Sequence, residues 1–412
     1  MSDTPVTDVA PDAKVGLAKE LGWRLRAGDG GLVPILIGLV VLVIIFQAKD
    51  SVFLSSGNLT NLFTQATIFI LLAMAEMWVL LLGEIDLSVG YSAGLGAAIA
   101  VIMVDPQFHW PWYLAMLLAV VTTTFIGGLL GFITIRLGLP SFIVTLAGLL
   151  GLEGVLIYFV DHQGTGGTVS VTNKVVYDLV NGSLSPLLTW VFVGASVVVF
   201  GFFIFRKDQL RRSSGLETVS LALTLLKIIL LVGASVVVVL IFNANRGSFI
   251  VLEGMPYAIL VDFAMLALGS FILTRTRIGR YIYAIGGNAE AARRAGINVN
   301  RYRLLAFMFT GFTAGVAGLL YASRLGGVSD GIDGGNLVLL AVASAVIGGT
   351  SLFGGRGKMI FAVIGGLVIA TIYNGMALLN LPAAEQYVAT ALVLLVAVAL
   401  DAIARRGSAV GR

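Results

Sequence analysis

Five ionisable side chains lie in or between long apolar runs of this chain, where they could bind a polar solute or carry protons. Glu76, Glu153, Lys227 and Asp262 fall inside such runs, and Asp86 falls at a break between two of them. A charge in a lipid bilayer is costly, so we expect these residues to face a cavity or the interior of a helix bundle. Coupled proton transport would explain them. Pairing inside the bundle, or snorkelling near the end of a span, explains Glu153 and Asp262 equally well.

Two glycine-rich stretches interrupt the apolar runs, one in each half of the chain. In residues 83–96, Asp86 or Ser88 can cap the helix that follows, and several glycines allow helix backbones to pack closely. The second stretch, residues 326–357, surrounds an apolar run of about 15 residues, which is short for a bilayer span. Interrupted helices in matching positions of two halves are typical of a transport pathway. Glycine packing and helix capping without any contact to a solute is the alternative interpretation.

The loop at residues 275–303 is the longest and most basic internal loop. Within it, Gly286 and Gly287 break the chain, Asn288 can cap a helix, and Glu290 sits in the first turn, where the helix dipole favours an acid. Two arginines and a glycine, Arg293, Arg294 and Gly296, then close this helix. A helix of about two turns is unstable in water by itself and needs a surface to dock on. A solvated basic loop that touches anionic lipid headgroups is the alternative.

Several kinds of chemistry lack the residues that they need. The chain has no cysteine and only two histidines, His109 and His162, so we expect no disulfide, thiolate nucleophile, iron–sulfur cluster or metal site. The phosphate-binding pattern of ATPases is missing, because Gly357-Lys358 is followed by Met359 and lacks the earlier glycine. Residues 327–331 match the Gly-x-Ser-x-Gly pattern of hydrolases, but no histidine comes after them. We therefore expect that the chain is not an enzyme.

Composition identifies a membrane protein. Hydrophobic residues make up 58% of the 412 residues and charged residues 12%, and the mean hydropathy is +0.99, whereas soluble domains carry about 25% charged residues. At about 20 apolar residues per span, the sequence predicts an all-α polytopic membrane helix bundle of about twelve transmembrane helices, with a range of about 10 to 14. The predicted spans are residues 32–48, 61–82, 88–104, 112–135, 139–160, 186–205, 216–242, 255–274, 304–323, 335–349, 358–379 and 385–404.

The basic residues predict the orientation of these spans. With the N-terminus in the cytosol, 21 of the 26 Lys and Arg residues fall in cytosolic segments, four fall outside and Lys227 lies within a span, in agreement with the positive-inside rule. Both termini are then cytosolic, with an N-terminal tail at 1–31, a transmembrane domain at 32–404 and a C-terminal tail at 405–412. The pI of about 9.3 reflects these loops, so we expect no nucleic-acid partner. The outside loop at 161–185 is polar, and we expect it to be solvated.

Four stretches resemble the permeases of bacterial monosaccharide ABC importers of the ribose and xylose type. Residues 290–296, Glu-Ala-Ala-Arg-Arg-Ala-Gly, are similar to the Glu-Ala-Ala, three residues, Gly signature of the helix that couples such permeases to their ATPase. The Ile and Leu-Pro elements of the longer signature are missing. Residues 83–90, 138–146 and 348–357 resemble the same permeases in the same order, so the resemblance extends over nearly the whole chain.

Two departures qualify this resemblance. The chain is longer than the usual ribose permease, because it has an extra polar loop and helix pair around residues 161–243, which xylose and multiple-monosaccharide permeases share. Glu84 stands where the family pattern has glycine, which leaves its local role open.

The resemblance implies two sets of functional residues. The residues that would couple the chain to an ATPase are Asn288, Glu290, Ala291, Ala292, Arg293, Arg294 and Gly296. A sugar needs polar groups that match its hydroxyls, with an aromatic face as an option. The residues that could line its pathway are Asp86, Ser88, Trp78, Tyr91, Asn336, Thr350 and Ser351.

The function that the resemblance implies is the permease subunit of an ATP-driven importer in the bacterial cytoplasmic (inner) membrane, with xylose or another pentose as the substrate. Its partners would be ABC ATPase subunits, which bind ATP and Mg²⁺, a periplasmic or lipid-anchored sugar-binding protein, a second permease copy in a homodimer, and membrane lipid. The chain itself would hold no cofactor. The alternative is an ion-coupled secondary transporter of a small polar solute that uses Glu76, Asp86 and Glu153.

Overall fold

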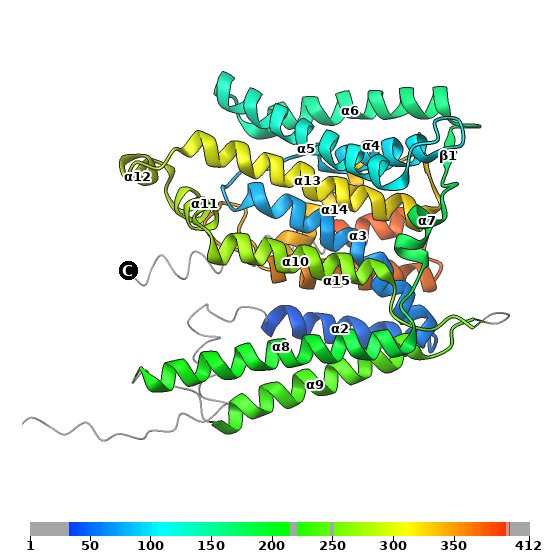
Figure 1. Ribbon diagram of the computed structural model, residues 1–412, viewed down its shortest axis with the longest axis vertical. Coiled ribbons are helices and arrows are strands. Elements are labelled where there is room, and N and C mark those ends of the chain that lie inside the picture. The colour runs from blue at the N-terminus through cyan, green and yellow to red at the C-terminus, as the bar shows by residue number, and fades with distance from the viewer. Residues whose placement is uncertain (1–32, 215–220, 248–250, 393–394, 396–412) are drawn as a thin grey trace, which may run out of the picture.

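The computed structural model describes residues 33–214, 221–247, 251–392 and 395, and most of these are helical (Figure 1). The helices are α2 (Val33–Lys49), α3 (Ser56–Leu80), α4 (Val89–Val104), α5 (Trp112–Leu137), α6 (Ser141–Gln163), α7 (Lys174–Asn181), α8 (Pro186–Ser213), α9 (Leu221–Asn243), α10 (Tyr257–Arg275), α11 (Arg277–Gly287), α12 (Ala289–Arg294), α13 (Val299–Leu325), α14 (Gly334–Ile347) and α15 (Met359–Leu378). The two strands are β1 (Thr168–Ser170) and β2 (Gly327–Ser329). The prediction of an all-α helix bundle therefore holds, apart from this two-stranded ribbon.

Eight helices within the described residues are long and apolar enough to cross a membrane: α3, α5, α6, α8, α9, α10, α13 and α15. Three shorter apolar helices, α2, α4 and α14, coincide with further predicted spans. The twelfth predicted span, 385–404, lies mostly outside the described residues, as do the predicted tails at 1–31 and 405–412. The chain is a multi-pass membrane protein, and a total of about twelve spans stays a prediction.

The core of the bundle is built from α3, α4, α13, α14 and α15 (Figure 1). Helix α3 is buried on nearly all sides, because α13, α14 and α15 all pack against it. Small residues permit this density in a bilayer, where no hydrophobic gain drives helix pairing. At the contact between α5 and α13, a Cβ on Gly311 would lie 2.1 Å from the carbonyl oxygen of Thr123. Only a residue without a side chain allows α5 and α13 to approach this closely at position 311.

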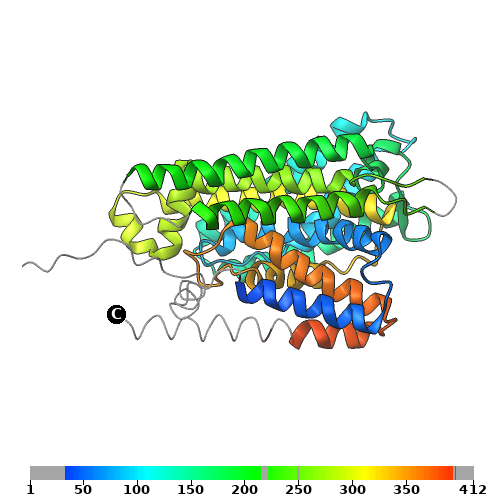
Figure 2. The same ribbon diagram turned by 90° about the horizontal axis from the view of Figure 1, so that it is seen from below.

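Helices α8 and α9 lie side by side along the edge of the bundle (Figures 1 and 2). Both are exposed along most of their length, and their exposed side chains are largely aliphatic and aromatic, as lipid contact requires. Lys227 is exposed near the start of α9, where a long side chain can reach the membrane interface. This placement explains how a charge is tolerated in this span.

The predicted solvated loop at 161–185 is more ordered than we expected. Strand β1 pairs antiparallel with β2, with Val169 opposite Val328, and α7 packs against the end of α13. The Ser323 hydroxyl of α13 donates a 2.6 Å hydrogen bond to the carbonyl of Tyr177 and accepts one of 2.9 Å from the Val180 amide. Sequence polarity did not reveal this order, because the partners of the loop come from residues about 150 positions later.

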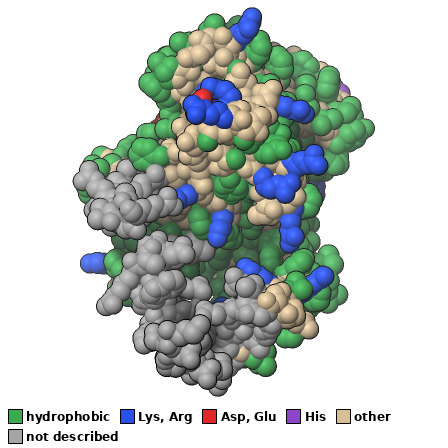
Figure 3. Space-filling view, turned by 90° about the vertical axis from the view of Figure 1, so that its left-hand side faces the viewer, with side chains coloured by type: hydrophobic (Ala, Val, Ile, Leu, Met, Phe, Trp, Pro, Cys, Tyr) green, Lys and Arg blue, Asp and Glu red, His purple; other side chains and the backbone are tan. Residues whose placement is uncertain are grey.

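The two ends of the bundle differ. Helices α11 and α12 project from one end, and α7 with β1 covers the other (Figure 1). Helix α2 begins at the same end as α11 and α12. Lys and Arg side chains gather on that end, as Figure 3 shows. An end rich in basic side chains is what the positive-inside rule predicts for a cytosolic face.

Candidate functional site

The predicted coupling helix is present as α12, a helix of six residues. The Asn288 side chain caps it by accepting a 2.9 Å hydrogen bond from the Ala291 amide, and Gly296 ends the segment at a φ of +81°. Glu290 forms ion pairs with Arg293 at 2.9 Å and with Arg294 at 3.2 Å. All three of these charged side chains are more than half exposed. Such pairs add little stability, so they are available to a partner.

One apolar contact fixes α12 to the rest of the chain. Ala292 is buried against Ile285 of α11 and Val299 of α13, and Leu82 packs against the same small cluster. Because α12 is too short to be stable without support, its orientation depends on this cluster. The small side chain of Ala292, together with the neighbouring Ala291, lets α12 lie close to α11 and α13 while its charged face points outward.

The first predicted break lies between α3 and α4, and its polar groups are buried. The Asp86 carboxylate accepts hydrogen bonds from the Ser88 amide at 2.9 Å and from the Ser88 hydroxyl. Ser88 precedes α4, and neither side chain accepts a hydrogen bond from the first turn of that helix, so the predicted capping by Asp86 or Ser88 is wrong. Glu76 of α3 accepts a 3.1 Å hydrogen bond from the Asp86 amide. The Thr145 hydroxyl of α6 accepts one of 3.0 Å from the Leu87 amide. These side chains satisfy an irregular backbone inside the bundle, as membrane burial demands.

The second glycine-rich stretch, residues 326–357, contains α14. The Asp333 carboxylate accepts a 2.9 Å hydrogen bond from the Asn336 amide and so caps α14. The starts of α4 and α14 touch, because a Cβ on Gly90 would lie 2.0 Å from the Gly334 carbonyl oxygen, and the Tyr91 ring packs on Gly334. Tyr91 and the half-buried Asn336 are thus brought to one place, where the N-termini of two short helices meet.

Glu153 of α6 joins this meeting point. Its carboxylate and that of Asp333 are both close enough to Tyr91 to act on it electrostatically. Glu153 is only partly buried and Asp333 is exposed. Acids are costly in contact with lipid, so we expect water or a protein partner around these two carboxylates.

Replacing Asp333 tests the capping of α14. We expect Asp333→Ala to lower the free energy of unfolding by about 1 kcal/mol, the usual cost of losing an N-cap, whereas Asp333→Asn keeps an acceptor oxygen and stays near the wild type. Thermal unfolding of the detergent-solubilised protein measures the difference. Equal melting temperatures for the alanine and asparagine variants would show that the cap contributes nothing.

Thr350 and Ser351 lie at a different place from Tyr91 and Asn336. They follow the C-terminal end of α14, in the loop at 348–358, whereas Asn336 lies at the N-terminal end. The Ser351 hydroxyl accepts a 3.1 Å hydrogen bond from the Phe353 amide. The Thr350 hydroxyl is buried and has no partner among the described residues. The seven predicted pathway residues therefore do not form one cluster.

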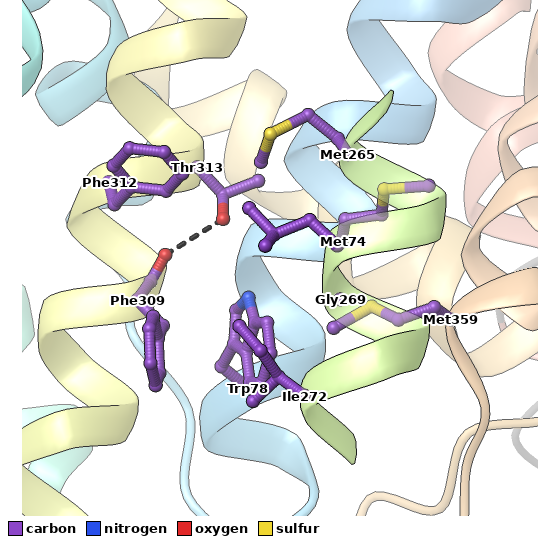
Figure 4. Close-up of a pocket in the computed structure, with 10 residues that line it drawn as sticks. Met74, Trp78, Met265, Gly269, Ile272, Phe309, Phe312, Thr313 and Met359 are labelled. Atoms are coloured by element: carbon purple, nitrogen blue, oxygen red, sulfur yellow. Dashed lines mark hydrogen bonds between the residues drawn. The ribbon is translucent and has the colours of Figure 1, made fainter. Parts of the chain in front are cut away.

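Trp78 lines a cavity of about 220 Å³ between α3, α10, α13 and α15 (Figure 4). Its ring stacks on Phe309 with centroids 4.7 Å apart. The cavity is otherwise lined by methionine, leucine, isoleucine, phenylalanine and glycine, and the Thr313 hydroxyl already donates a 2.8 Å hydrogen bond to the Phe309 carbonyl. Apolar walls of this kind do not match sugar hydroxyls. The structure separates Trp78 from the polar meeting point at Tyr91.

Sequence reasoning missed three residues at these sites. Asp333 carries a local signal, since an acid three residues before Asn336 and ahead of an apolar run has the spacing of a cap. The ion pair between Glu84 and Arg303 has no such signal, because its partners are 219 residues apart.

Comparisons with known proteins agree with this architecture. The chain is 36% identical over 382 residues to the xylose transport system permease protein XylH of Escherichia coli (strain K12), covering 91% of this chain and 92% of that protein. The corresponding XylH of Haemophilus influenzae is 34% identical over 380 residues, covering 92% and 98%. The ribose import permease protein RbsC of Haemophilus influenzae is 29% identical over 365 residues, covering 89% and 91%. No solved structure matches the chain.

The match to a protein family covers most of the bundle, from α3 to beyond α15. Residues 58–398 match the family described as branched-chain amino acid transport system, permease component. Both breaks, α12 and the ends of α4 and α14 that meet all lie within this range. The chain belongs to this family of membrane-spanning permease components of transport systems.

Proposed function

We propose that the chain is the permease subunit of an ATP-driven monosaccharide importer, with xylose as its substrate. The observation that carries the proposal is the exposed, capped and basic helix α12 on a chain that lacks a phosphate-binding motif of its own. A permease that cannot hydrolyse ATP needs a surface on which an ATPase subunit can dock. Full-length similarity to xylose permeases, at 36% and 34% identity, supports the choice of substrate.

The assembly that follows has several partners. ABC ATPase subunits bind ATP and Mg²⁺ and seat α12, with Asn288, Glu290 and Gly296 shaping the contact. A sugar-binding protein delivers xylose to the opposite face, where α7 and the β1–β2 ribbon lie. A second copy of the chain completes a homodimer with cytosolic termini. This chain hydrolyses no ATP and holds no cofactor, in keeping with a transport subunit of the bacterial inner membrane.

Within this proposal, the sugar passes the point where α4 and α14 meet. Tyr91 offers an aromatic face there, and Asn336, Glu153 and Asp333 offer polar groups that can match sugar hydroxyls. Asp86 holds Ser88 directly before α4, and the predicted contact of both residues with sugar stays a prediction. Alternating access would then open this point to one side of the membrane at a time.

Transport in proteoliposomes tests the proposal. The permease is reconstituted with the ATPase and the sugar-binding protein that copurify with it, and uptake of labelled xylose is measured with and without ATP. We expect ATP-dependent uptake of xylose, weaker uptake of ribose and none of leucine, which the family description makes the necessary comparison. Uptake of leucine instead of xylose, or uptake by the permease alone, would contradict the proposal.

The ion-coupled alternative predicts a different response to energy sources. If Glu76, Asp86 and Glu153 carried protons, a protonophore would stop uptake while ATP is maintained. The structure gives Glu76 and Asp86 a role in binding the backbone of the first break. We therefore expect uptake to persist with the protonophore and to stop when ATP is depleted.

A further inference from the structure

The segment at residues 81–84, directly after α3, is in contact with α11 and with the loop before α15. A Cβ on Gly286 of α11 would lie 1.8 Å from the Leu81 carbonyl oxygen and 2.6 Å from the Gly355 nitrogen. The Gly355 amide donates a 2.9 Å hydrogen bond to that same carbonyl. The end of α11, the end of α3 and the loop before α15 therefore meet backbone to backbone, and none can move far without the others.

Apolar and polar contacts strengthen this junction. Leu82 packs into the small cluster that holds Ala292 of α12. The Tyr283 hydroxyl of α11 donates a 2.7 Å hydrogen bond to the Gly357 carbonyl. Burial raises the pKa of Tyr283, so its hydroxyl remains protonated and remains a donor at neutral pH. Helices α11 and α12 are thus joined to the end of α3 and to the loop before α15.

An ion pair closes the junction on its other side. Arg303, in the second turn of α13, pairs through its Nε with a carboxylate oxygen of Glu84. The side chains are 25% and 12% exposed, so the pair is shielded much more than the surface pairs of α12. The other Glu84 oxygen is buried without a partner among the described residues. The pair joins α13, which starts five residues after α12 ends, to the break before α4.

The far end of the same break leads to the start of α4. Only Ile85 and Asp86 separate Glu84 from Leu87, whose amide donates a hydrogen bond to Thr145, and Ser88, the residue before α4, follows directly. The start of α4 touches the start of α14 at Gly90. A short segment with hydrogen-bonded backbone amides therefore connects Glu84 to the place where the two helices meet.

We infer that the Glu84–Arg303 ion pair is the link that carries movement of α12 and α13 to the start of α4, and that Glu84 and Arg303 are positioning residues for transport. The inference rests on the proposed function, since it needs an ATPase that moves α12. It also assigns a role to Glu84, which stands where the family pattern has glycine: Glu84 binds Arg303. The pair stays closed as α12 moves, and it keeps the start of α13 at a fixed distance from the break before α4.

Charge-neutralising single variants and a charge-exchanged double variant test the link. In the reconstituted complex, Glu84→Gln and Arg303→Gln are expected to lower the number of xylose molecules transported per ATP hydrolysed by about fivefold or more, the range of typical coupling energies, while ATP hydrolysis continues. The double variant Glu84→Arg with Arg303→Glu restores the pair with its charges exchanged, and we expect it to recover most of the ratio. Arg136→Gln, which neutralises an exposed arginine in the last turn of α5, is the matched control and should leave the ratio unchanged.

A crosslinking experiment keeps the test decisive if a charge variant folds poorly. The chain has no cysteine, so Glu84→Cys with Arg303→Cys gives one defined pair in the otherwise native sequence. Without a crosslinker this variant should hydrolyse ATP but transport little xylose. A short reversible bis-methanethiosulfonate linker should restore transport, and its reduction should abolish it again.

The results separate this inference from the proposed function. Wild-type coupling ratios in both single-charge variants, or transport by the cysteine pair that is unaffected by the linker, would overturn the link while leaving an ATP-driven importer in place. Absence of ATP-dependent uptake by the wild-type complex would instead overturn the proposed function.

Discussion

Replacing Gly90 by alanine is expected to abolish transport and to destabilise the protein. A Cβ at this position would lie 2.0 Å from the carbonyl oxygen of Gly334 and 2.8 Å from its carbonyl carbon. Both atoms belong to backbone, so no side-chain rotation relieves the clash, and α4 and α14 must separate. Overpacking of this kind costs about 1–3 kcal/mol, occasionally more. Because the two helices start there, their separation also deforms the proposed pathway.

Thermal unfolding in detergent and xylose uptake in proteoliposomes measure the two effects of Gly90→Ala. Gly151→Ala is the matched control, since a Cβ at Gly151 has no atom within 4 Å and the helix α6 there is exposed. We expect the control to keep its melting temperature and its uptake. A Gly90 variant with wild-type stability and wild-type uptake would show that the close approach of α4 and α14 is not required.

Reversing the charge of Glu290 is expected to uncouple uptake from ATP hydrolysis. Glu290→Lys removes the pairs with Arg293 and Arg294 and places a third positive charge on the exposed face of α12. Because these pairs are solvent-exposed, they contribute little to folding, and membrane insertion and melting temperature should stay near the wild type. A partner surface shaped for the wild-type charges would reject the variant, since like charges at an interface cost several kcal/mol.

The measurement is ATP-driven xylose uptake together with the amount of ATPase that copurifies with the permease. We expect uptake to fall by about tenfold or more, equivalent to about 1.4 kcal/mol of lost interaction, and less ATPase to copurify. Glu385→Lys reverses an exposed acid near the opposite end of the bundle and serves as the control. Full uptake by the Glu290 variant would refute the role of α12. A bulky residue at Gly296 is also expected to lower ATP-driven uptake, because the φ of +81° at this position suits glycine.

Local patterns in the sequence were sufficient to predict the class of protein, the approximate bounds of eleven helices and the capped helix at Asn288. Apolar length is a property of a continuous segment, because a bilayer requires a fixed number of residues to cross it. A cap likewise involves residues two or three positions apart. The basic face formed around α11 and α12 follows from the composition of one loop. These features depend on neighbours along the chain, so they could be read without a fold.

Contacts between distant segments were decided by the tertiary structure alone. The Glu84–Arg303 pair joins residues 219 positions apart, and the contact of Gly90 with Gly334 joins two breaks that the sequence shows only separately. The same packing separates Trp78, in an apolar cavity, from Tyr91, which packs on Gly334. The sequence around a glycine or an acid does not show whether the residue contacts lipid, the backbone of another helix or an opposite charge. Which of these it meets depends on how the helices cross, and that is determined by the packing of the whole bundle.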